Sequence, residues 1–132
     1  MTRVLALDYG AAGCGSAVSD PTRTVAIPLR TVERPESPAG MESLAELVDE
    51  TDAGLVVVGL PLTLQGEEGE QAAAARSFAG RLRAAVDVPV ELYDERLTTR
   101  SAVRAGGDAD EDSRAAAHLL EGWLRSTPRS GA

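Results

Sequence analysis

Two acidic side chains stand at the ends of predicted strands, where α/β proteins usually carry out their chemistry. Asp8 follows the apolar run 4–7, and Glu95 lies just beyond the apolar run 88–92. A buried strand gains nothing structurally from a carboxylate at its end, and an ionised carboxylate is costly to remove from water unless it is paired or bound to a metal. The two residues therefore suggest a site for a divalent cation.

Both carboxylates also have a purely structural interpretation. Asp8 could accept backbone hydrogen bonds in the turn at Gly10, because aspartate is common in turns. Glu95 could form an ion pair with Arg96 or with the next arginine of the chain, and Asp94 competes with it for the same site. The sequence leaves these alternatives open.

The net charge of −8 argues against a broad basic surface that binds nucleic acid through many phosphates. Any contact with phosphate must therefore be local. Arg96, Arg100 and Arg104 recur every four residues, so on a helix they would form one basic stripe beginning beside Glu95. We predict a helix over 98–105 and interpret this arginine stripe as a candidate phosphate contact.

Short strands separated by glycine and proline are predicted for the first part of the chain. Residues 4–7, 14–19 and 24–30 are expected to form an antiparallel meander. A helix is predicted over 38–49, because apolar residues recur there at helical spacing and Ser37 stands as an N-cap before a proline.

A central strand is predicted at 55–58, because this apolar run is continuous and bounded by glycines, as in a parallel strand covered on both faces. Residues 59–69 cannot continue that strand and are expected to form an ordered surface loop. A helix over 71–86, a strand over 88–92 and a helix over 112–124 complete the prediction.

The length of 132 residues suits one domain with a real core, which we expect to span 1–126 before a flexible tail over 127–132. A single cysteine, Cys14, excludes an intramolecular disulfide, favours a reducing compartment and is expected to act as a small buried hydrophobe. We expect no secretory segment, and the sequence contains no run of about 18 apolar residues. We therefore expect a cytoplasmic protein with no membrane partner.

Four blocks of residues follow one another along the chain: Leu7-Asp8-Tyr9-Gly10, Val58-Gly59-Leu60-Pro61-Leu62, Asp94-Glu95-Arg96-Leu97-Thr98-Thr99, and Asp112 with Leu119-Leu120-Glu121-Gly122-Trp123-Leu124. With these blocks the chain resembles the YqgF-type (RuvX-like) family over nearly its whole length. That family is described both as Holliday junction resolvases and as pre-16S rRNA nucleases.

The predicted element order is that of the ribonuclease H-like fold, which the resemblance also implies. We expect an α/β domain whose mixed five-stranded sheet combines an antiparallel meander with parallel strands and is flanked by helices. The resemblance further implies metal-dependent cleavage of phosphodiester bonds by three acidic residues, Asp8, Glu95 and Asp112.

Two Mg²⁺ or Mn²⁺ ions about 3.5–4 Å apart are expected, held by carboxylates while water and phosphate complete their coordination. Asp8 is the natural bridging ligand. Asp112 has a simpler alternative role, because carboxylates in the first turn of a helix cap amides and interact favourably with the helix dipole. His118 is expected to be solvated on a polar helix face rather than to be a ligand.

The expected activity is hydrolysis of ester bonds in structured nucleic acid, with 5′-end processing of pre-16S rRNA in ribosome biogenesis as the first choice. The alternatives are Holliday junction resolution and a catalytically weak nucleic-acid-binding or ribosome-assembly factor. A nucleotide-binding lobe of the actin-like kinases is disfavoured, because those enzymes close two lobes around ATP. The expected partners are pre-rRNA or branched DNA and the ribosome, with the chain a monomer or homodimer.

The first hairpin departs from the family pattern. After Gly10 the chain has Ala11-Ala12-Gly13, where the family usually carries basic residues. We therefore expect weak substrate binding, which Gly13→Arg should strengthen.

Overall fold

The computed structural model describes residues 2–10, 12–60, 69–94 and 111–126. Its strands are β1 (Arg3–Asp8), β2 (Gly13–Ser19), β3 (Ala26–Pro28), β4 (Val32–Glu33), β5 (Ala53–Leu60) and β6 (Val90–Asp94). Its helices are α1 (Pro38–Thr51), α2 (Glu70–Ala85) and α3 (Glu111–Ser126). The predicted helix 98–105 and tail 127–132 lie outside these described residues.

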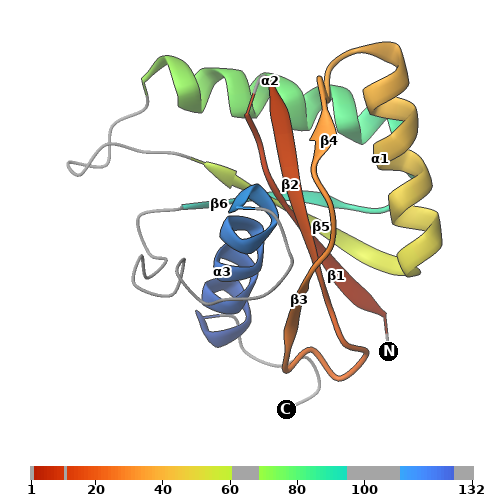
Figure 1. Ribbon diagram of the computed structural model, residues 1–132, viewed down its shortest axis with the longest axis vertical. Helices are drawn as coiled ribbons and strands as arrows, with labels where there is room; N and C mark the ends of the chain where they lie inside the picture. The colour runs from red at the N-terminus through yellow and green to blue at the C-terminus, as the bar shows by residue number, and fades with distance from the viewer. Residues whose placement is uncertain (1, 11, 61–68, 95–110, 127–132) are drawn as a thin grey trace.

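The sheet is mixed and runs in the order β3-β2-β1-β5-β6, with β4 also paired to β2 (Figure 1). The pairs that β2 makes with β1, β3 and β4 are antiparallel, whereas β5 is parallel to both β1 and β6. This arrangement confirms the predicted α/β class, with a meander followed by parallel strands. It has six strands rather than five.

The additional strand, β4, lies just beyond the segment predicted as one strand over 24–30, of which only residues 26–28 form β3. The Ser16 hydroxyl donates to the Arg30 carbonyl oxygen at 2.5 Å, and the Arg30 N–H donates to the same hydroxyl oxygen at 3.2 Å. A side chain thus takes the place of a backbone partner in the ladder. β3 and β4 therefore pair with β2 on either side of this point rather than as one continuous strand.

The central strand is longer than predicted. Residues 59–60, expected to leave the strand, continue β5 and pair with residues 93–94 of β6. Backbone hydrogen bonding to a neighbouring strand satisfies the polar groups of a glycine as well as those of a valine. The strand predicted over 88–92 is correspondingly displaced toward the C-terminus as β6.

The start of α1 is as predicted. The Ser37 hydroxyl accepts the Gly40 N–H at 3.0 Å, and Pro38 is the first helical residue, where its missing N–H costs nothing. The helix ends at Thr51 and is capped by Asp52, whose left-handed backbone (φ 57°) lets its N–H donate to the Asp49 and Val48 carbonyls.

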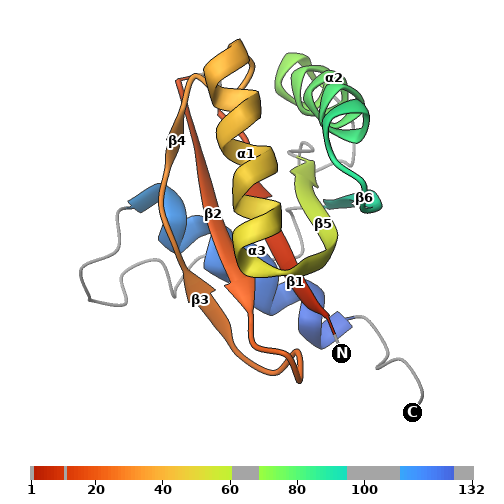
Figure 2. The same cartoon turned by 90° about the vertical axis from the view of Figure 1, so that its right-hand side faces the viewer.

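The strand pleat divides the apolar side chains between two cores, one on each face of the sheet. The helices α1 and α2 cover one face and α3 covers the other (Figure 2). Leu5 and Leu7 of β1 face α1 and α2 and pack in the same cluster as Phe78. Val4 and Ala6 face α3 and pack in the same cluster as Leu120 and Trp123 of that helix. Among the helices that the structure describes, none combines the length and hydrophobicity needed to cross a bilayer.

Candidate functional site

Asp8 is the last residue of β1, at the edge of the sheet where the parallel strands β1, β5 and β6 end. It alternates with Val4 and Ala6, which pack beneath α3, so its side chain lies on the α3 face. Its Cα partner in the neighbouring strand is Gly15. The end of β1 therefore presents a carboxylate beside a strand position that has no side chain.

The first turn of α3 lies directly against Gly15. A Cβ at that position would be 2.0 Å from the Asp112 carbonyl oxygen and 2.8 Å from the Ser113 backbone nitrogen. Only glycine permits so close an approach between helix and strand. Ser113 is fully buried, and its hydroxyl lies 3.5 Å from the Ser16 backbone nitrogen. The contact with Gly15 thus places Asp112 at the same edge of the sheet as Asp8.

The Asp112 carboxylate extends over the beginning of β2. A Cβ at Gly13 would lie 3.5 Å from Asp112 Oδ2. Burial raises the pKa of the Cys14 thiol, and the negative charges of Asp8 and Asp112 raise it further. Both carboxylates are therefore close enough to Cys14 to act on the same thiol, which stays neutral and fully buried as a small hydrophobe.

The structure thus brings together two of the three predicted acidic residues. Glu95 lies outside the described residues, as do Arg96, Arg100 and Arg104. Within the described residues, no three His, Cys, Asp or Glu side chains form a group able to hold a metal ion. Two carboxylates are nevertheless a suitable donor set for Mg²⁺ or Mn²⁺, because these ions prefer oxygen ligands, and Mg²⁺ is usually bound through only one or two carboxylates.

The register of β6 separates Asp94 from these two carboxylates. Leu92 packs in the core under α1 and α2, whereas Tyr93 packs in the core under α3. Alternation therefore assigns Asp94 to the α2 face, opposite the face on which Asp8 lies. This placement disfavours Asp94 as a member of the site.

A polar network lies on the other face, directly behind Asp8. The Tyr9 hydroxyl donates to Glu36 Oε1 at 2.5 Å, and Arg81 Nη1 lies 3.5 Å from Glu36 Oε2. The Tyr9 ring stacks on Phe78 of α2. The pKa of Tyr9 is raised to about 12, mainly by burial and to a smaller extent by the hydrogen bond to the Glu36 carboxylate. The hydroxyl therefore stays protonated and acts as a donor.

Sequence reasoning missed Gly15, Ser113 and the network around Tyr9. A signal for the first was present, because Gly13 and Gly15 are spaced by two and so lie on one face of a strand. Glycines inside a strand often mark a place where another backbone approaches closely. The partner of Tyr9 had no comparable signal, since Glu36 is distant in sequence and comes from the segment before α1.

The prediction that His118 is solvated is wrong. Its side chain is only 13% exposed, and its Nδ1 lies 3.3 Å from Glu121 Oε1, one turn further along α3. Helical spacing alone placed this residue on a polar face but could not show how much of that face is covered.

A side chain at position 13 would lie against the candidate site itself. A Cβ at Gly13 would lie 2.9 Å from Thr31 Cγ2 and next to the Asp112 carboxylate. Gly13 is not in the left-handed region, so the obstacle to a side chain is space and charge rather than backbone strain. Ala12, by contrast, is exposed at the hairpin.

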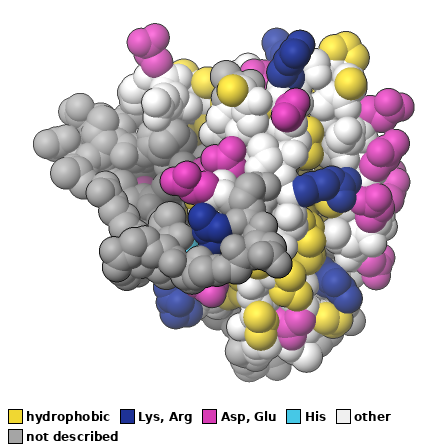
Figure 3. Space-filling model, viewed as in Figure 1, with side chains coloured by type: hydrophobic (Ala, Val, Ile, Leu, Met, Phe, Trp, Pro, Cys, Tyr) yellow, Lys and Arg dark blue, Asp and Glu magenta, His cyan; other side chains and the backbone are white. Residues whose placement is uncertain are grey.

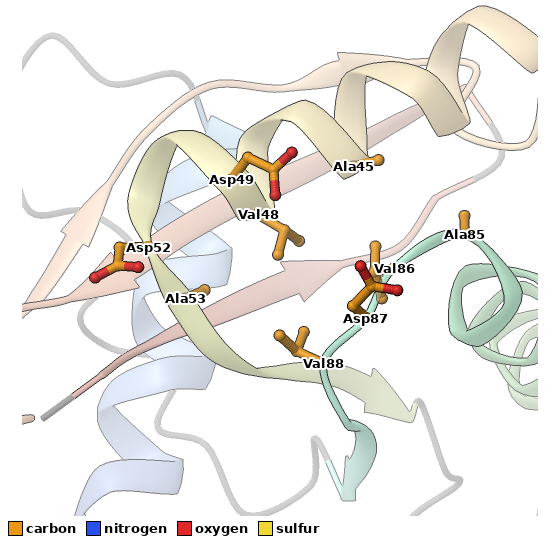
Figure 4. Close-up of a pocket in the computed structure, with 9 residues that line it drawn as sticks. All are labelled: Ala45, Val48, Asp49, Asp52, Ala53, Ala85, Val86, Asp87 and Val88. Carbon is orange, nitrogen blue, oxygen red and sulfur yellow. The ribbon is translucent and has the colours of Figure 1, made fainter.

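A cavity lies at the opposite edge of the sheet, between the end of α1, the start of β5 and the segment that follows α2 (Figure 4). Its polar lining consists of Asp49, Asp52 and Asp87. Ala53 in its wall pairs with Arg3 at the start of β1, whereas Asp8 ends that strand. Ligands of open α/β sheets bind at the carboxyl ends of the strands, so this cavity does not belong to the site.

Comparison with known proteins identifies the family. The family model RuvX, described as Holliday junction resolvase, matches residues 2–126. Relatives named "Putative pre-16S rRNA nuclease" include one from Rhodococcus opacus, 41% identical over 97% of this chain and 80% of its own length. Another, from Anaeromyxobacter sp., is 44% identical over 92% of this chain and 96% of its own length.

Solved structures agree on the fold. RuvC of Thermus thermophilus in complex with a Holliday junction substrate superposes with a TM-score of 0.62, covering 96% of this chain and 95% of that chain at 17% identity. A second structure of this RuvC gives a TM-score of 0.55 at 16% identity. These similarities confirm the ribonuclease H-like architecture predicted from the order of the elements. By its family match and its relatives, the chain belongs to the RuvX family.

Proposed function

We propose that this protein is a metal-dependent endonuclease that hydrolyses phosphodiester bonds in structured nucleic acid, with precursor 16S rRNA as its substrate. The observation that carries the proposal is the meeting of Asp8 and Asp112 at the carboxyl edge of the parallel strands, made possible by Gly15. Membership of the RuvX family and the names of the relatives support a nuclease activity.

Asp8, Asp112 and Glu95 are the residues that would hold Mg²⁺ or Mn²⁺, and we propose a site for two ions. When bound, such ions activate a water molecule for attack and stabilise the leaving oxygen. Glu95 is preferred over Asp94 because Asp94 is assigned to the opposite face of the sheet. A histidine base is not required, in keeping with the pairing of His118 to Glu121 on α3.

The protein contributes placement and electrostatics. Asp8 is fixed by its strand pairing with Gly15, and Asp112 by the contact of the first turn of α3 with the same glycine. The N-terminus of α3 carries the positive end of the helix dipole, which favours a phosphate there as well as the Asp112 carboxylate. The N-terminus of α3 therefore stabilises both the Asp112 carboxylate, a proposed metal ligand, and a phosphate of the substrate.

Charge on the surface favours an approach of nucleic acid away from α1. Acidic side chains gather along this helix (Figure 3), and the exposed ones are Glu42, Glu46, Asp49 and Glu50. Phosphates are repelled by such a surface. We propose instead that Arg96, Arg100 and Arg104, which follow Glu95 in the chain, contact the substrate backbone.

The family description favours Holliday junction resolution as a second candidate function. A direct assay separates the two: purified protein is incubated with a precursor 16S rRNA fragment and with a four-way DNA junction, each with Mg²⁺ and with a chelator. We expect Mg²⁺-dependent cleavage of the RNA. Cleavage of the DNA junction alone would favour resolution, and binding to the RNA without cleavage under any condition would favour an assembly factor.

A further inference from the structure

Tyr9 is anchored on the face of the sheet opposite Asp8. Its ring stacks on Phe78 of α2, with centroids 4.6 Å apart and planes inclined by 22°. Its hydroxyl donates to Glu36 at 2.5 Å, and Glu36 in turn faces Arg81 of α2 at 3.5 Å. The segment before α1 and the middle of α2 therefore converge on one tyrosine at the end of β1.

The place of Tyr9 in the chain connects this network to the carboxylate site. Consecutive residues at the end of a strand point to opposite faces, so Tyr9 packs toward α1 and α2 while Asp8 lies toward α3. Gly10 follows in a tight turn, where even a Cβ would come within 2.8 Å of the Gly13 carbonyl oxygen. Tyr9 is thus the last side chain that can anchor the backbone of β1 before the turn.

Packing alone does not account for the polar part of this network. A phenylalanine could make the same ring contact with Phe78. The Glu36 side chain is only 33% exposed, and holding a carboxylate beside the core costs free energy that its partners must offset. Apolar packing alone would be enough to hold the Tyr9 ring in place. The polar contacts of Tyr9 with Glu36, and of Glu36 with Arg81, therefore add a constraint on the orientation of the Tyr9 side chain.

We infer that Tyr9 is a positioning residue for Asp8: held by Glu36 and Phe78, it fixes the backbone at the end of β1 so that the Asp8 carboxylate keeps one orientation beside Asp112. The inference rests on the proposed nuclease function. Tyr9 itself lies on the far face of the sheet and acts only through the peptide that it shares with Asp8.

The test compares two substitutions that remove the same atom. Tyr9→Phe removes the hydroxyl that binds Glu36, keeps the ring and changes no charge. Tyr93→Phe is the matched control, because the Tyr93 hydroxyl lies 3.3 Å from Ser126 Oγ in an exposed contact. For each variant the measurements are the Mn²⁺ dissociation constant by titration calorimetry, kcat and KM for cleavage, and the melting temperature without metal.

Loss of a group that orients a metal ligand typically weakens metal affinity or activity by about 10- to 100-fold. We therefore expect Tyr9→Phe to raise the Mn²⁺ dissociation constant by about tenfold and to lower kcat while KM for nucleic acid is unchanged. Tyr93→Phe should stay within about twofold of wild type in every measurement.

Two variants of Glu36 separate the hydrogen bond from the charge. Glu36→Gln keeps an acceptor for the Tyr9 hydroxyl and should retain most of the Mn²⁺ affinity, whereas Glu36→Ala removes the acceptor and should behave like Tyr9→Phe. If Tyr9→Phe does not fold, the contrast between these two variants decides the question.

Wild-type Mn²⁺ affinity and kcat in Tyr9→Phe would overturn the inference, whatever happens to the melting temperature, because the hydroxyl would then have only a structural role. The proposed nuclease function would not be affected by that outcome, because both the wild-type protein and Tyr9→Phe would still cleave nucleic acid. If the wild-type protein binds no Mn²⁺ and cleaves no nucleic acid, the proposed function fails and the inference fails with it.

Discussion

Gly15 offers the sharpest perturbation of the site, because one added methyl group displaces the helix that carries Asp112. In Gly15→Ala the new Cβ would stand 2.0 Å from the Asp112 carbonyl oxygen and 2.3 Å from its carbonyl carbon. Real Cβ atoms essentially never come within 3.0 Å of such atoms. The first turn of α3 must therefore retreat by about 1 Å, since no flexible side chain is available to yield instead.

The size of the effect follows from that displacement. Overpacking of this kind typically costs about 1–3 kcal/mol. For a domain of this length, each kcal/mol lowers the melting temperature by about 3–5 °C, so we expect a loss of about 3–15 °C. A misplacement of about 1 Å can reduce catalysis by about 100-fold, because Asp112 moves away from Asp8.

The assay pairs thermal unfolding with the single-turnover cleavage rate. Gly80→Ala is the matched control: this glycine lies in α2 with nothing within 4 Å of its would-be Cβ, and alanine there should stabilise the helix by about 0.5–1 kcal/mol without changing cleavage. If Gly15→Ala melts like wild type and cleaves at the wild-type rate, Gly15 does not set the position of Asp112 and the reasoning is refuted.

Three further predictions concern substrate contact, pH and the first hairpin. Neutralising Arg96, Arg100 or Arg104 should lower the salt slope of RNA binding by about one unit for each that contacts a phosphate; unchanged slopes for all three would leave the arginine stripe as a solvated face. Tyr9 and Cys14 hold their protons in the fold above their ordinary pKa values of 10.0 and 9.0, whereas the unfolded chain releases them. Their stabilisation is therefore complete below about pH 9 and is lost as the pH rises toward about 12. Urea unfolding between about pH 8 and pH 11 checks the sign, and constant or rising stability would contradict it. In Gly13→Arg the new Cβ would meet Thr31 and lie 3.5 Å from Asp112 Oδ2, so the arginine is attached directly beside a proposed metal ligand. We therefore expect weaker Mn²⁺ binding in calorimetry rather than the gain in substrate affinity expected from the sequence. Stronger RNA binding with intact Mn²⁺ affinity would support the expectation from the sequence.

Local patterns in the sequence were sufficient for much of the fold. The cap at Ser37 and the buried strand at 55–58 depend on residues close together in the chain, and both are found as predicted. The end of the third strand before Arg30 depends instead on the Ser16 hydroxyl bonding to Arg30, and the continuation of β5 depends on a partner strand. Such long-range contacts have no periodic signature.

The candidate site likewise has one part that local sequence patterns predict and another that depends on long-range contacts. A carboxylate after an apolar run is visible in the sequence, which is why Asp8 could be selected. Its proximity to Asp112 depends on α3 crossing the sheet against Gly15, a contact between residues far apart in the chain. The roles of Glu95, Arg96, Arg100 and Arg104 lie outside the described residues and stay predictions.

The central claim is that Asp8 and Asp112 form one metal-dependent site. The most direct test measures single-turnover cleavage of a precursor 16S rRNA fragment, together with Mn²⁺ binding, in Asp8→Asn and Asp112→Asn. Asp49→Asn, an exposed carboxylate at the opposite edge of the sheet, is the control for the change in charge.

Metal ions contribute several kcal/mol to such reactions, and each 1.36 kcal/mol is a factor of about ten in rate. We therefore predict that both site variants lose at least about 100-fold in rate and bind Mn²⁺ weakly, with an unchanged or higher melting temperature in the absence of metal because a clustered charge is gone. Asp49→Asn should match wild type. Wild-type cleavage and Mn²⁺ affinity in Asp8→Asn would contradict the account.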